Sequence, residues 1–517
     1  MSSRYDIDKL NRLENIKKNL FKLPTEEVLE RVKTKADYYI YQGKCEDEEA
    51  AKDDKALLGQ SWETKDNTAY EPTQDIRNKI KPLLKKQARF MFGKEPTIVI
   101  KADDPKKDKE ECENLRKFLD DVFEKNNFWT NTKKAFLEST IKKRVLLRAE
   151  VIKGQPIKLK YEKIEDFFYK EIGNILMEVS FFEEDLNNVY INKDDEKKYY
   201  IHKYNYGKNG EVLYTKLTYE GGNTDPSEIE GPADTGLIKI PCWLIKNGGE
   251  LNSKYGESDI EDLKDAQDQY NRRNSDLADA LKFQLFGAEA VIDGDEEDVN
   301  NFTVSPGAVH AVKTRDDVSD NRQAVIQRLE YNLGSADVVN SYLDRAEKDM
   351  RDALDMPNIK DLNNIPSAKA MKYLYNDLIV RCEEKWNDWE PVLKDVVNLI
   401  MEYGLTCYTN YNKNWNNIKF TLDFKHNYPL PSDEEDKKKV AMEEVQANVR
   451  SVVSYIQEYS DSEDPQEEFN TIVEEKRILA EAEADSFNKA LKSEGTEENN
   501  DNEDDEDKKK NFIEDDK

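Results

Sequence analysis

The sequence has few histidines, few cysteines and no long apolar run, and each shortage excludes a class of protein. Its 517 residues include only three histidines, which lie far apart, so neighbours in sequence cannot form a two-histidine site. The five cysteines are odd in number and widely separated, which excludes a disulfide framework or a C-x-x-C metal clip from sequence neighbours. No apolar run reaches the roughly 18 residues of a membrane-spanning helix, and residues 1–22 lack the apolar segment of a secretory signal. We therefore expect synthesis in a reducing cytoplasm.

Sequence motifs for catalysis are also missing. The chain has neither the G-x-x-x-x-G-K-[ST] loop of nucleotide-binding ATPases nor the G-x-S-x-G turn of hydrolases. The acidic run 293–298 departs from a calcium loop, because Asp298 and Val304 stand where Gly and Glu are required. We expect no catalytic residue, no metal and no cofactor, and a solvated turn at 293–298. Three further residues are expected to be buried packing residues rather than a nucleophile or base-stacking platforms: Cys242, Trp386 and Trp389.

What the chain has in excess is negative charge. Lys and Arg number 79 and Asp and Glu 109, so the formal net charge is 79 − 109 = −30. This balance argues against a general nucleic-acid binder, which needs cations against the phosphates. The 19 Phe, 26 Tyr and 6 Trp supply enough apolar surface for an ordered chain. We expect an elongated, surface-rich or oligomeric molecule of two to four domains.

Periodicity predicts helices and then sheet in the first half of the chain. Apolar residues at three- and four-residue spacings predict helices over 75–92, 105–123 and 129–140. The first of these is expected to end at Gly93 in a left-handed cap. From 145 to 246, short β-rich runs alternate with Gly and Asn turns, which predicts a mostly antiparallel sheet.

Two helices with thin apolar stripes follow the sheet. Ser258 and Glu261 have the spacing of a capping box, which predicts a helix running unbroken to about Phe283. A second helix is predicted over 335–354. The first stripe is too narrow for a core helix, so we expect it to lie against a neighbouring copy of the chain. The residues expected to pack this two-helix unit are Ile260, Leu263, Tyr270, Leu277, Tyr342 and Leu343.

The remaining segments are a small insert, a loop, a long helix and an acidic end. Between the two helices, runs at 288–292 and 308–312 are strand-like, and the chain then enters a loop bracketed by Pro357 and Pro366. A long helix is predicted beyond this loop, to about Tyr403, with a bend at Pro391. Next we expect a short strand over 418–422. Two helices should follow, one that begins with a capping box at 432–435 and one that begins at 464–465. The chain ends in an acidic tail that we expect to be disordered.

Several local motifs resemble one family of proteins. The run 92–96 (FGKEP) is similar to an aromatic-Gly-x-x-Pro turn of that family, and 255–260 (YGESDI) to its G-x-S-D start of a stem helix. Residues 268–278 match its D-x-Y-N-x-x-x-S-D-x-A run, and 357–358 with 366–370 resemble its tunnel loop and the helix after it. The chain thereby resembles, over roughly 70–490, the portal proteins of tailed double-stranded DNA bacteriophages of the siphophage type.

The resemblance implies an α+β fold built from the parts of a portal subunit. The implied parts are a wing over 1–257, a first stem helix over 258–284, a clip over 285–334, a second stem helix over 335–354, a tunnel loop over 355–366, a spine helix and strand of the wing over 367–431, a helical crown over 432–492 and a disordered acidic tail over 493–517.

The resemblance also implies a function and a set of partners. In the virion, twelve copies would form a ring at one capsid vertex, through which double-stranded DNA is packaged and ejected. The ring would contact the terminase packaging ATPase, a head-tail adaptor, and the capsid and scaffold proteins, with no membrane partner and no cofactor. The protein would be made in the cytoplasm of the host bacterium.

Two groups of site residues are expected on this basis. Lys360 would lie nearest the DNA and touch phosphates transiently, although an ordinary solvated loop lysine fits the sequence equally well. The expected tunnel-loop residues are Asn358, Lys360, Asn363 and Asn364. The expected contacts of the clip with the adaptor are Phe302, Val304 and Val309.

Two other interpretations compete with a portal. Composition alone fits an acidic helical scaffold or interaction protein without a DNA channel, but such a scaffold has no need for a β insert between two thin-striped helices. A nuclease would need clustered Asp, Glu and His on a β scaffold, and the sequence provides no such cluster.

Overall fold

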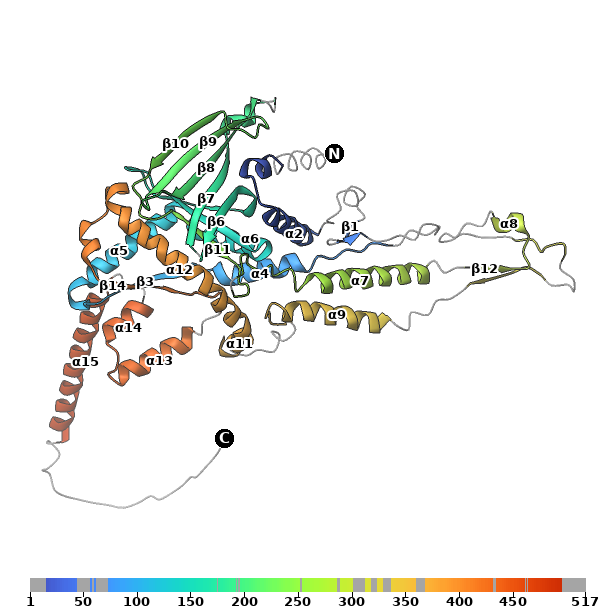
Figure 1. Ribbon diagram of the computed structural model, residues 1–517. Helices are drawn as coiled ribbons and strands as arrows, with labels where there is room; N and C mark the ends of the chain where they lie inside the picture. The colour runs from blue at the N-terminus through green and yellow to red at the C-terminus, as the bar shows by residue number, and fades with distance from the viewer. Residues whose placement is uncertain are drawn as a thin grey trace, which may run out of the picture. The chain divides into compact units, whose positions relative to one another are not determined.

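The structure is a computed structural model that divides the chain into two compact units (Figure 1). One unit holds Met1–Pro366 and Ala370–Leu430, and the other holds Ser367–Lys369 and Pro431–Lys517. The residues described are 15–43, 56–57, 60–61, 73–173, 175–191, 193, 196–251, 253–285, 289–300, 312–317, 323–328, 336–358, 368–430, 434–460, 462 and 464–494.

The helices predicted over 75–92, 105–123 and 129–140 are found as α4 (Ile80–Phe92), α5 (Pro105–Lys125) and α6 (Phe128–Lys142), and α2 (Thr25–Gln42) precedes them. Both ends of the first prediction contain an error, because residues 75–79 form no helix and the helix ends differently at Gly93. The left-handed cap predicted at Gly93 is wrong, since this residue has φ −74° and ψ −32° in the right-handed region. Glycine is required there for a different reason: a Cβ atom would lie 2.0 Å from the carbonyl oxygen of Arg89.

The antiparallel sheet expected between 145 and 246 is confirmed, as two sheets rather than one. The larger has the order β10-β9-β8-β7-β6, and the smaller has the order β11-β4-β5. Their strands are β4 (Arg144–Glu150), β5 (Lys158–Glu162), β6 (Phe167–Ile172), β7 (Ile175–Glu184), β8 (Lys198–Tyr206), β9 (Val212–Glu220), β10 (Glu228–Asp234) and β11 (Cys242–Lys246).

The helix predicted from 367 to about 403 is interrupted early. It forms α11 (Ala368–Leu374) and α12 (Asn376–Cys407), and the break falls at Tyr375, with α12 continuing through Pro391. The ring of Tyr375 stacks on Phe90 at a centroid distance of 5.5 Å, so an aromatic contact accompanies the break. The strand predicted over 418–422 is found as β14 (Phe420–Lys425), which pairs with β3 (Thr97–Ala102).

The main hydrophobic core lies between α4, α6, α12 and the sheet of β4, β5 and β11. Trp386 and Trp389 are each 1% exposed and pack around Phe92 at centroid distances of 4.9 and 5.5 Å. Both tryptophans are therefore packing residues, as predicted. Cys242 is also buried, in β11, and burial raises the pKa of its thiol to about 12, which disfavours a nucleophilic thiolate.

The second unit contains helices α13 (Glu434–Gln446), α14 (Val452–Tyr459) and α15 (Pro465–Glu494). The predicted start at Asp464 is confirmed, because its carboxylate oxygen Oδ1 accepts hydrogen bonds from the amides of Gln466 and Glu467 at 2.9 and 3.2 Å. The capping box predicted at 432–435 begins outside the described residues, as does most of the acidic tail expected to be disordered.

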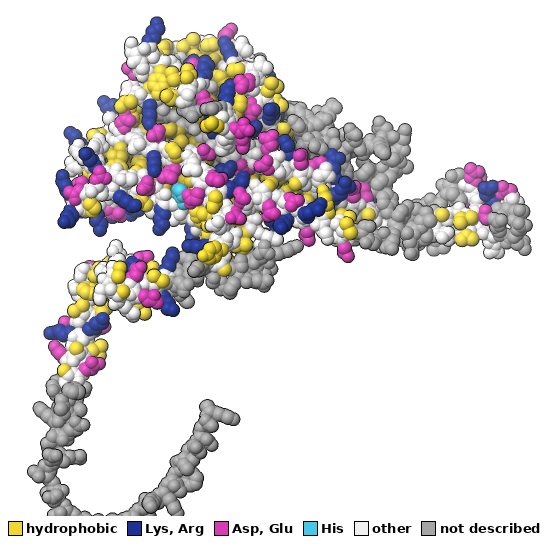
Figure 2. All heavy atoms as spheres, turned by 60° about the horizontal axis from the view of Figure 1, so that its bottom comes forward, with side chains coloured by type: hydrophobic (Ala, Val, Ile, Leu, Met, Phe, Trp, Pro, Cys, Tyr) yellow, Lys and Arg dark blue, Asp and Glu magenta, His cyan; other side chains and the backbone are white. Residues whose placement is uncertain are grey.

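The described surface carries charges of both signs. On the face in Figure 2, Asp and Glu side chains lie among Lys and Arg side chains. Over the described part of this face, no broad cationic area of the kind that holds a nucleic acid by its phosphates is present.

Candidate functional site

The predicted two-helix unit consists of α7 (Lys264–Leu285) and α9 (Ala336–Asp352), which lie side by side (Figure 1). Tyr270 and Leu343 are each 8% exposed and belong to the main core, and Leu277 packs against that core. Tyr342 is half-buried, with the guanidinium of Arg345 5.1 Å from its ring centroid. Tyr270, Leu277 and Leu343 therefore join the pair of helices to the main core.

Ile260 and Leu263 have a different position from the one predicted. They precede α7, in a turn over 259–263, and both are 0% exposed in the main core. The chain itself therefore covers the residues that we expected a neighbouring copy to cover.

The predicted capping box at the start of α7 is not formed, and the helix begins six residues later than expected. The Ser258 hydroxyl donates to the carbonyl of Ile141 at 2.9 Å and accepts from the amide of Ile260 at 3.3 Å. The amide of Glu261 bonds to the backbone carbonyl of Ser258 at 3.1 Å, and the Glu261 side chain is exposed. Ser258 thus fixes a turn to the end of α6 instead of capping a helix.

Gly256 explains why the motif begins with glycine. A Cβ atom at this position would lie 2.3 Å from the carbonyl oxygen of Lys143 and 2.7 Å from the amide nitrogen of Asn247. Real Cβ contacts are not that short, and both neighbours are backbone atoms that cannot turn aside. Only glycine lets the chain pass between the end of α6 and the end of β11.

Asp259 is the centre of a buried polar cluster at the root of α7. Its carboxylate pairs with Lys385 Nζ at 2.8 Å and accepts from Asn247 Nδ2 at 3.0 Å and Gln87 Nε2 at 3.1 Å. Burial opposes ionisation, yet Lys385 and Arg381 hold the pKa of Asp259 below its usual value. One side chain therefore connects the root of α7 to α4, β11 and α12.

A second polar arrangement runs along α7 and was not predicted. We call residues 73–79 the strap, a segment outside the helices and strands that ends where α4 begins. Its backbone amides at every second residue donate to side chains at every fourth residue of α7. The four pairs are Thr73 with Asp279 at 3.0 Å, Asp75 with Ser275 Oγ at 2.9 Å, Arg77 with Asn271 Oδ1 at 3.0 Å and Lys79 with Gln267 Oε1 at 2.7 Å.

The spacing of this ladder follows from helix and strand geometry. Four residues of an α-helix rise about 6.0 Å, and two residues of an extended chain rise about 6.6 Å. A polar stripe at i, i+4, i+8 and i+12 can therefore take the place of a neighbouring strand. Asn271 and Ser275 belong to the D-x-Y-N-x-x-x-S-D run, so the structure gives that motif a physical reason.

The expected clip is described only in part. β12 (Glu289–Ile292) pairs antiparallel with β13 (Val325–Arg328), a strand that the sequence did not predict. The solvated turn predicted over 293–298 is found only at 293–295, because α8 (Glu296–Asn300) begins within it. Residues 293–295 bond to the backbone of 313–315, for example from Asp295 N to Lys313 O at 2.8 Å. Three predicted adaptor contacts lie outside the described residues: Phe302, Val304 and Val309.

The expected tunnel loop is described only at its beginning. Asn358 Oδ1 accepts a hydrogen bond from Arg351 Nη1 of α9 at 3.4 Å, and Leu354 and Met356 just before it are 0% and 3% exposed. The first residues of the loop are therefore fixed to the core. The other predicted loop residues lie outside the described part of the chain: Lys360, Asn363 and Asn364.

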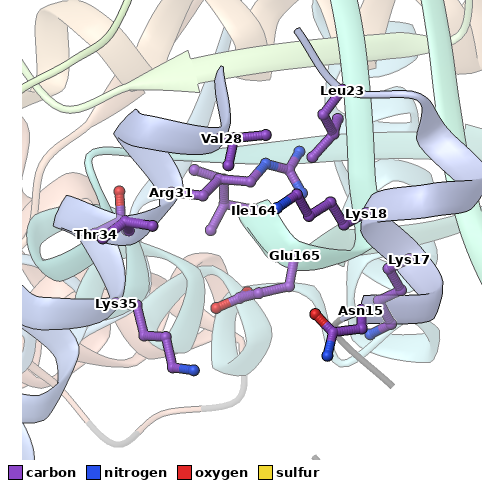
Figure 3. A pocket seen from close by; sticks show the side chains of 11 residues that line it. Asn15, Lys17, Lys18, Leu23, Val28, Arg31, Thr34, Lys35, Ile164 and Glu165 are labelled. Carbon is purple, nitrogen blue, oxygen red and sulfur yellow. The ribbon is translucent and has the colours of Figure 1, made fainter. Parts of the chain in front are cut away.

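A pocket of about 210 Å³ opens between the N-terminal helices and the start of β6 (Figure 3). Its walls carry apolar and cationic groups, and two of the cations pair with carboxylates of the chain. Lys17 pairs with Asp166, and Arg31 pairs with Glu27 at 2.8 Å. The Glu165 carboxylate in the same pocket pairs with Lys142. These pairs describe a packed junction rather than a site for chemistry.

The described residues contain no group of three His, Cys, Asp or Glu side chains that could hold a metal ion. Over the same part of the chain, no helix has both the length and the apolar character needed to cross a bilayer.

Comparison with known proteins gives one result. The family model described as phage portal protein, SPP1 Gp6-like, matches residues 22–482. A search of curated proteins found no match. The matched range contains the Asp259 cluster, the strap, α7, α9 and the described strands of the insert.

Proposed function

We propose that this chain, which belongs to the family of SPP1 Gp6-like phage portal proteins, closes into a ring that forms the DNA channel at one vertex of a capsid. Family membership makes it a structural protein of the phage capsid vertex, used in DNA packaging and head-to-tail connection. The finer statements are proposals: the ring of twelve, the passage of double-stranded DNA, and docking of the terminase ATPase and the head-tail adaptor.

The observation that carries the proposal is the match over 22–482, and the root of α7 supports it. In a cyclic ring each copy presents two different surfaces to its two neighbours, so the stem helices must keep a fixed angle to the rest of the subunit. The buried Asp259–Lys385 pair and the fully buried Ile260 and Leu263 provide such a fixed root. A freely hinged helix pair would not close a ring reproducibly.

We assign the parts of the chain to portal parts as the motifs suggest. The sheets and helices before 258 are the wing, α7 and α9 the stem, the strands β12 and β13 the base of the clip, and α12 the spine. α13 to α15 are the crown. The loop over 355–366, with Lys360, is the part we assign to the channel wall nearest the DNA.

The negative net charge of the chain supports a channel whose wall does not bind the DNA tightly. A cation that binds a phosphate releases a condensed counterion, which makes the contact favourable, so many such contacts at fixed positions would hold the duplex. A subunit with a net charge of −30 instead repels the duplex, and a ring of such subunits repels it from all sides. A single lysine such as Lys360 can then touch phosphates briefly without stopping the DNA.

Two measurements test this proposal: the shape of the purified protein, and whether particles need the protein in order to fill with DNA. Negative-stain microscopy of the full-length chain should show rings with a central hole, and particles made without the protein should fail to fill with DNA. Rods or monomers at every concentration would favour the second candidate, an acidic scaffold without a channel. Normal filling without the protein would contradict the portal function outright.

A further inference from the structure

We infer that the strap, residues 73–79, is a releasable clamp on the stem helix α7: it detaches from the distal half of the helix while the root of the helix stays in the core. The inference rests on the proposed function for its biological use, but the clamp itself is a property of the subunit. It assigns a conformational task to the polar stripe formed by Gln267, Asn271, Ser275 and Asp279.

The strap is held to the helix by polar contacts. Besides the four amide contacts, Gln267 Nε2 donates to the carbonyl of Arg77 at 2.8 Å, and Asn274 Nδ2 donates to the carbonyl of Asp75 at 3.2 Å. In the described chain, none of the strap side chains belongs to a hydrophobic core cluster, whereas the next residue, Ile80, belongs to the main cluster. Because net hydrogen bonds contribute only about 1 kcal/mol each, such a segment can detach at far lower cost than a core element.

The contacts weaken in one direction. Gln267, Asn271 and Ser275 are each 0% exposed, whereas Asp279 is only half-buried and the Lys282 side chain that reaches Thr73 at 3.1 Å is exposed. Water therefore competes for the bonds at Thr73 first and for those at Lys79 last. The geometry points to opening from the Thr73 end.

The helix α7 is held most firmly at its root, which is the end where the strap is also held most firmly. Its root at Ile260 and Leu263 is fully buried, but Leu281 near its other end is 46% exposed. Past Tyr270 the strap supplies much of what holds the helix on its polar side. Release of the strap therefore removes the polar contacts of the distal half of α7, which then keeps its packing against α9 and, through Leu277, against the core, without disturbing the root.

Lys79 couples the clamp to the second stem helix. Its ammonium pairs with Glu347 of α9 at 3.0 Å and lies 5.2 Å from the ring centroid of Tyr270 on α7. The last residue of the strap thus contacts both stem helices at once. When the strap is bound, Lys79 links the two helices. When the strap opens from the Thr73 end, this link at Lys79 remains in place.

The test is hydrogen–deuterium exchange of the full-length assembled protein, read by mass spectrometry over overlapping peptides of 73–80. In the wild type, we expect exchange at Thr73 and Asp75 to be faster than at Lys79, and all three to be faster than at Leu147 in β4. Ser275→Ala removes the acceptor of the Asp75 amide and should speed its exchange about tenfold, the effect of losing roughly one buried hydrogen bond. Ser341→Ala, at an exposed serine of α9, is the matched control and should change nothing.

Two results would overturn the clamp. One is exchange at 73–79 as slow as in β4 with the same response to denaturant, which would mean that the strap opens only when the core unfolds. The other is exchange in Ser275→Ala equal to that in Ser341→Ala.

A functional readout connects the clamp to DNA. Ser275→Ala and Asp279→Ala should form rings as the wild type does, yet the yield or retention of packaged DNA should differ from that of Ser341→Ala. If Ser275→Ala and Asp279→Ala loosen the strap but package as much DNA as Ser341→Ala, the clamp has no part in packaging. Failure of the proposed function looks different, because the wild type itself would then form no rings.

Discussion

At the scale of single residues, two buried carboxylates near the root of the stem contribute to the pH dependence of stability in opposite directions. Asp259 belongs to the turn over 259–263, and Asp37 of α2 interacts with Ser258 just before that turn, but the surroundings of the two carboxylates differ. Asp259 has two cations beside it, whereas burial raises the pKa of Asp37 to about 6 in spite of Lys143. The first carboxylate therefore stabilises the folded chain when ionised, and the second destabilises it when ionised.

Asp37→Asn should stabilise the protein at pH 7 to 8. The folded state binds the proton of Asp37 more tightly than the unfolded state, so the free energy of unfolding falls as pH rises from about 4 to about 6. An asparagine avoids the cost of burying the ionised carboxylate, worth up to about 3 kcal/mol. Thermal melts at several pH values measure this, and the difference from wild type should vanish below pH 4. A gain of the same size at pH 4 would mean that ionisation is not the cause.

Asp259→Ala should destabilise the protein by about 3 to 5 kcal/mol, because it leaves Lys385 buried without its partner. Denaturant unfolding of the purified protein measures the loss. Asp262→Ala, at an exposed aspartate three residues away, serves as the control and should stay within about 0.5 kcal/mol of wild type. Similar losses in both variants would show that the cluster is not the anchor.

Lys360→Glu belongs to the same scale, although its effect is on DNA. If Lys360 lies on the channel wall, the variant should form normal rings but lower the yield of packaged DNA, since a carboxylate there repels phosphates. Quantification of DNA in purified particles tests this. Normal packaging by the variant would return Lys360 to the class of ordinary solvated lysines.

At the scale of elements, the helices and most strands could be predicted from the sequence, but the contacts that position them could not. α5 and α6 follow apolar periodicity, so pattern alone found them. β10 is exposed at all of its residues and lacks the alternation that marks a half-buried strand, and it was missed. The predicted capping box failed because the Ser258 hydroxyl bonds to Ile141, far away in sequence.

The site shows the same limit more clearly. Asp259 and Lys385 are 126 positions apart, so no pattern of nearby residues in the sequence predicts that they pair. The stripe of Gln267, Asn271, Ser275 and Asp279 is visible in the sequence as polar residues at every fourth position. It could have been noticed, but its partner, the strap, could not be identified without coordinates.

Gly256→Ala tests the packing of elements at the root of the stem. The added methyl group meets two backbone atoms, so the end of α6 or of β11 must shift, at a cost of about 1 to 3 kcal/mol. Melting temperature and soluble yield report the effect. Gly222→Ala is a suitable control, because a Cβ atom there meets nothing within 4 Å. Equal behaviour of the two variants would argue against a tight passage at Gly256.

At the scale of the whole molecule, the chain combines a well-packed first unit with a second unit that buries little. In the described part of the second unit, Ala441 and Ile456 are the apolar residues exposed by less than 9%, whereas Val473, Ile478 and Leu479 on α15 are 49%, 55% and 62% exposed. A unit with so few buried side chains does not fold strongly by itself. The first unit must therefore contribute most of the stability measured in solution.

Truncation after Leu491 should leave the folded protein intact. The residues removed are mostly Asn, Asp, Glu and Lys and offer almost no apolar surface for a core. Circular dichroism and the melting temperature of the truncated protein should equal those of the full-length chain within error. Insoluble protein on truncation would show that the acidic end takes part in folding.

The pairing of β3 with β14 has a consequence for how the protein is made. Residues 97–102 find their only partner strand in the described chain at 420–425, so a ribosome must synthesise more than four fifths of the polypeptide before that sheet can close. At bacterial translation rates of about 5 to 20 residues per second, the early strand waits for tens of seconds. Nascent chains that stop short of the late strand should be substrates for chaperones and proteases instead of subunits for assembly.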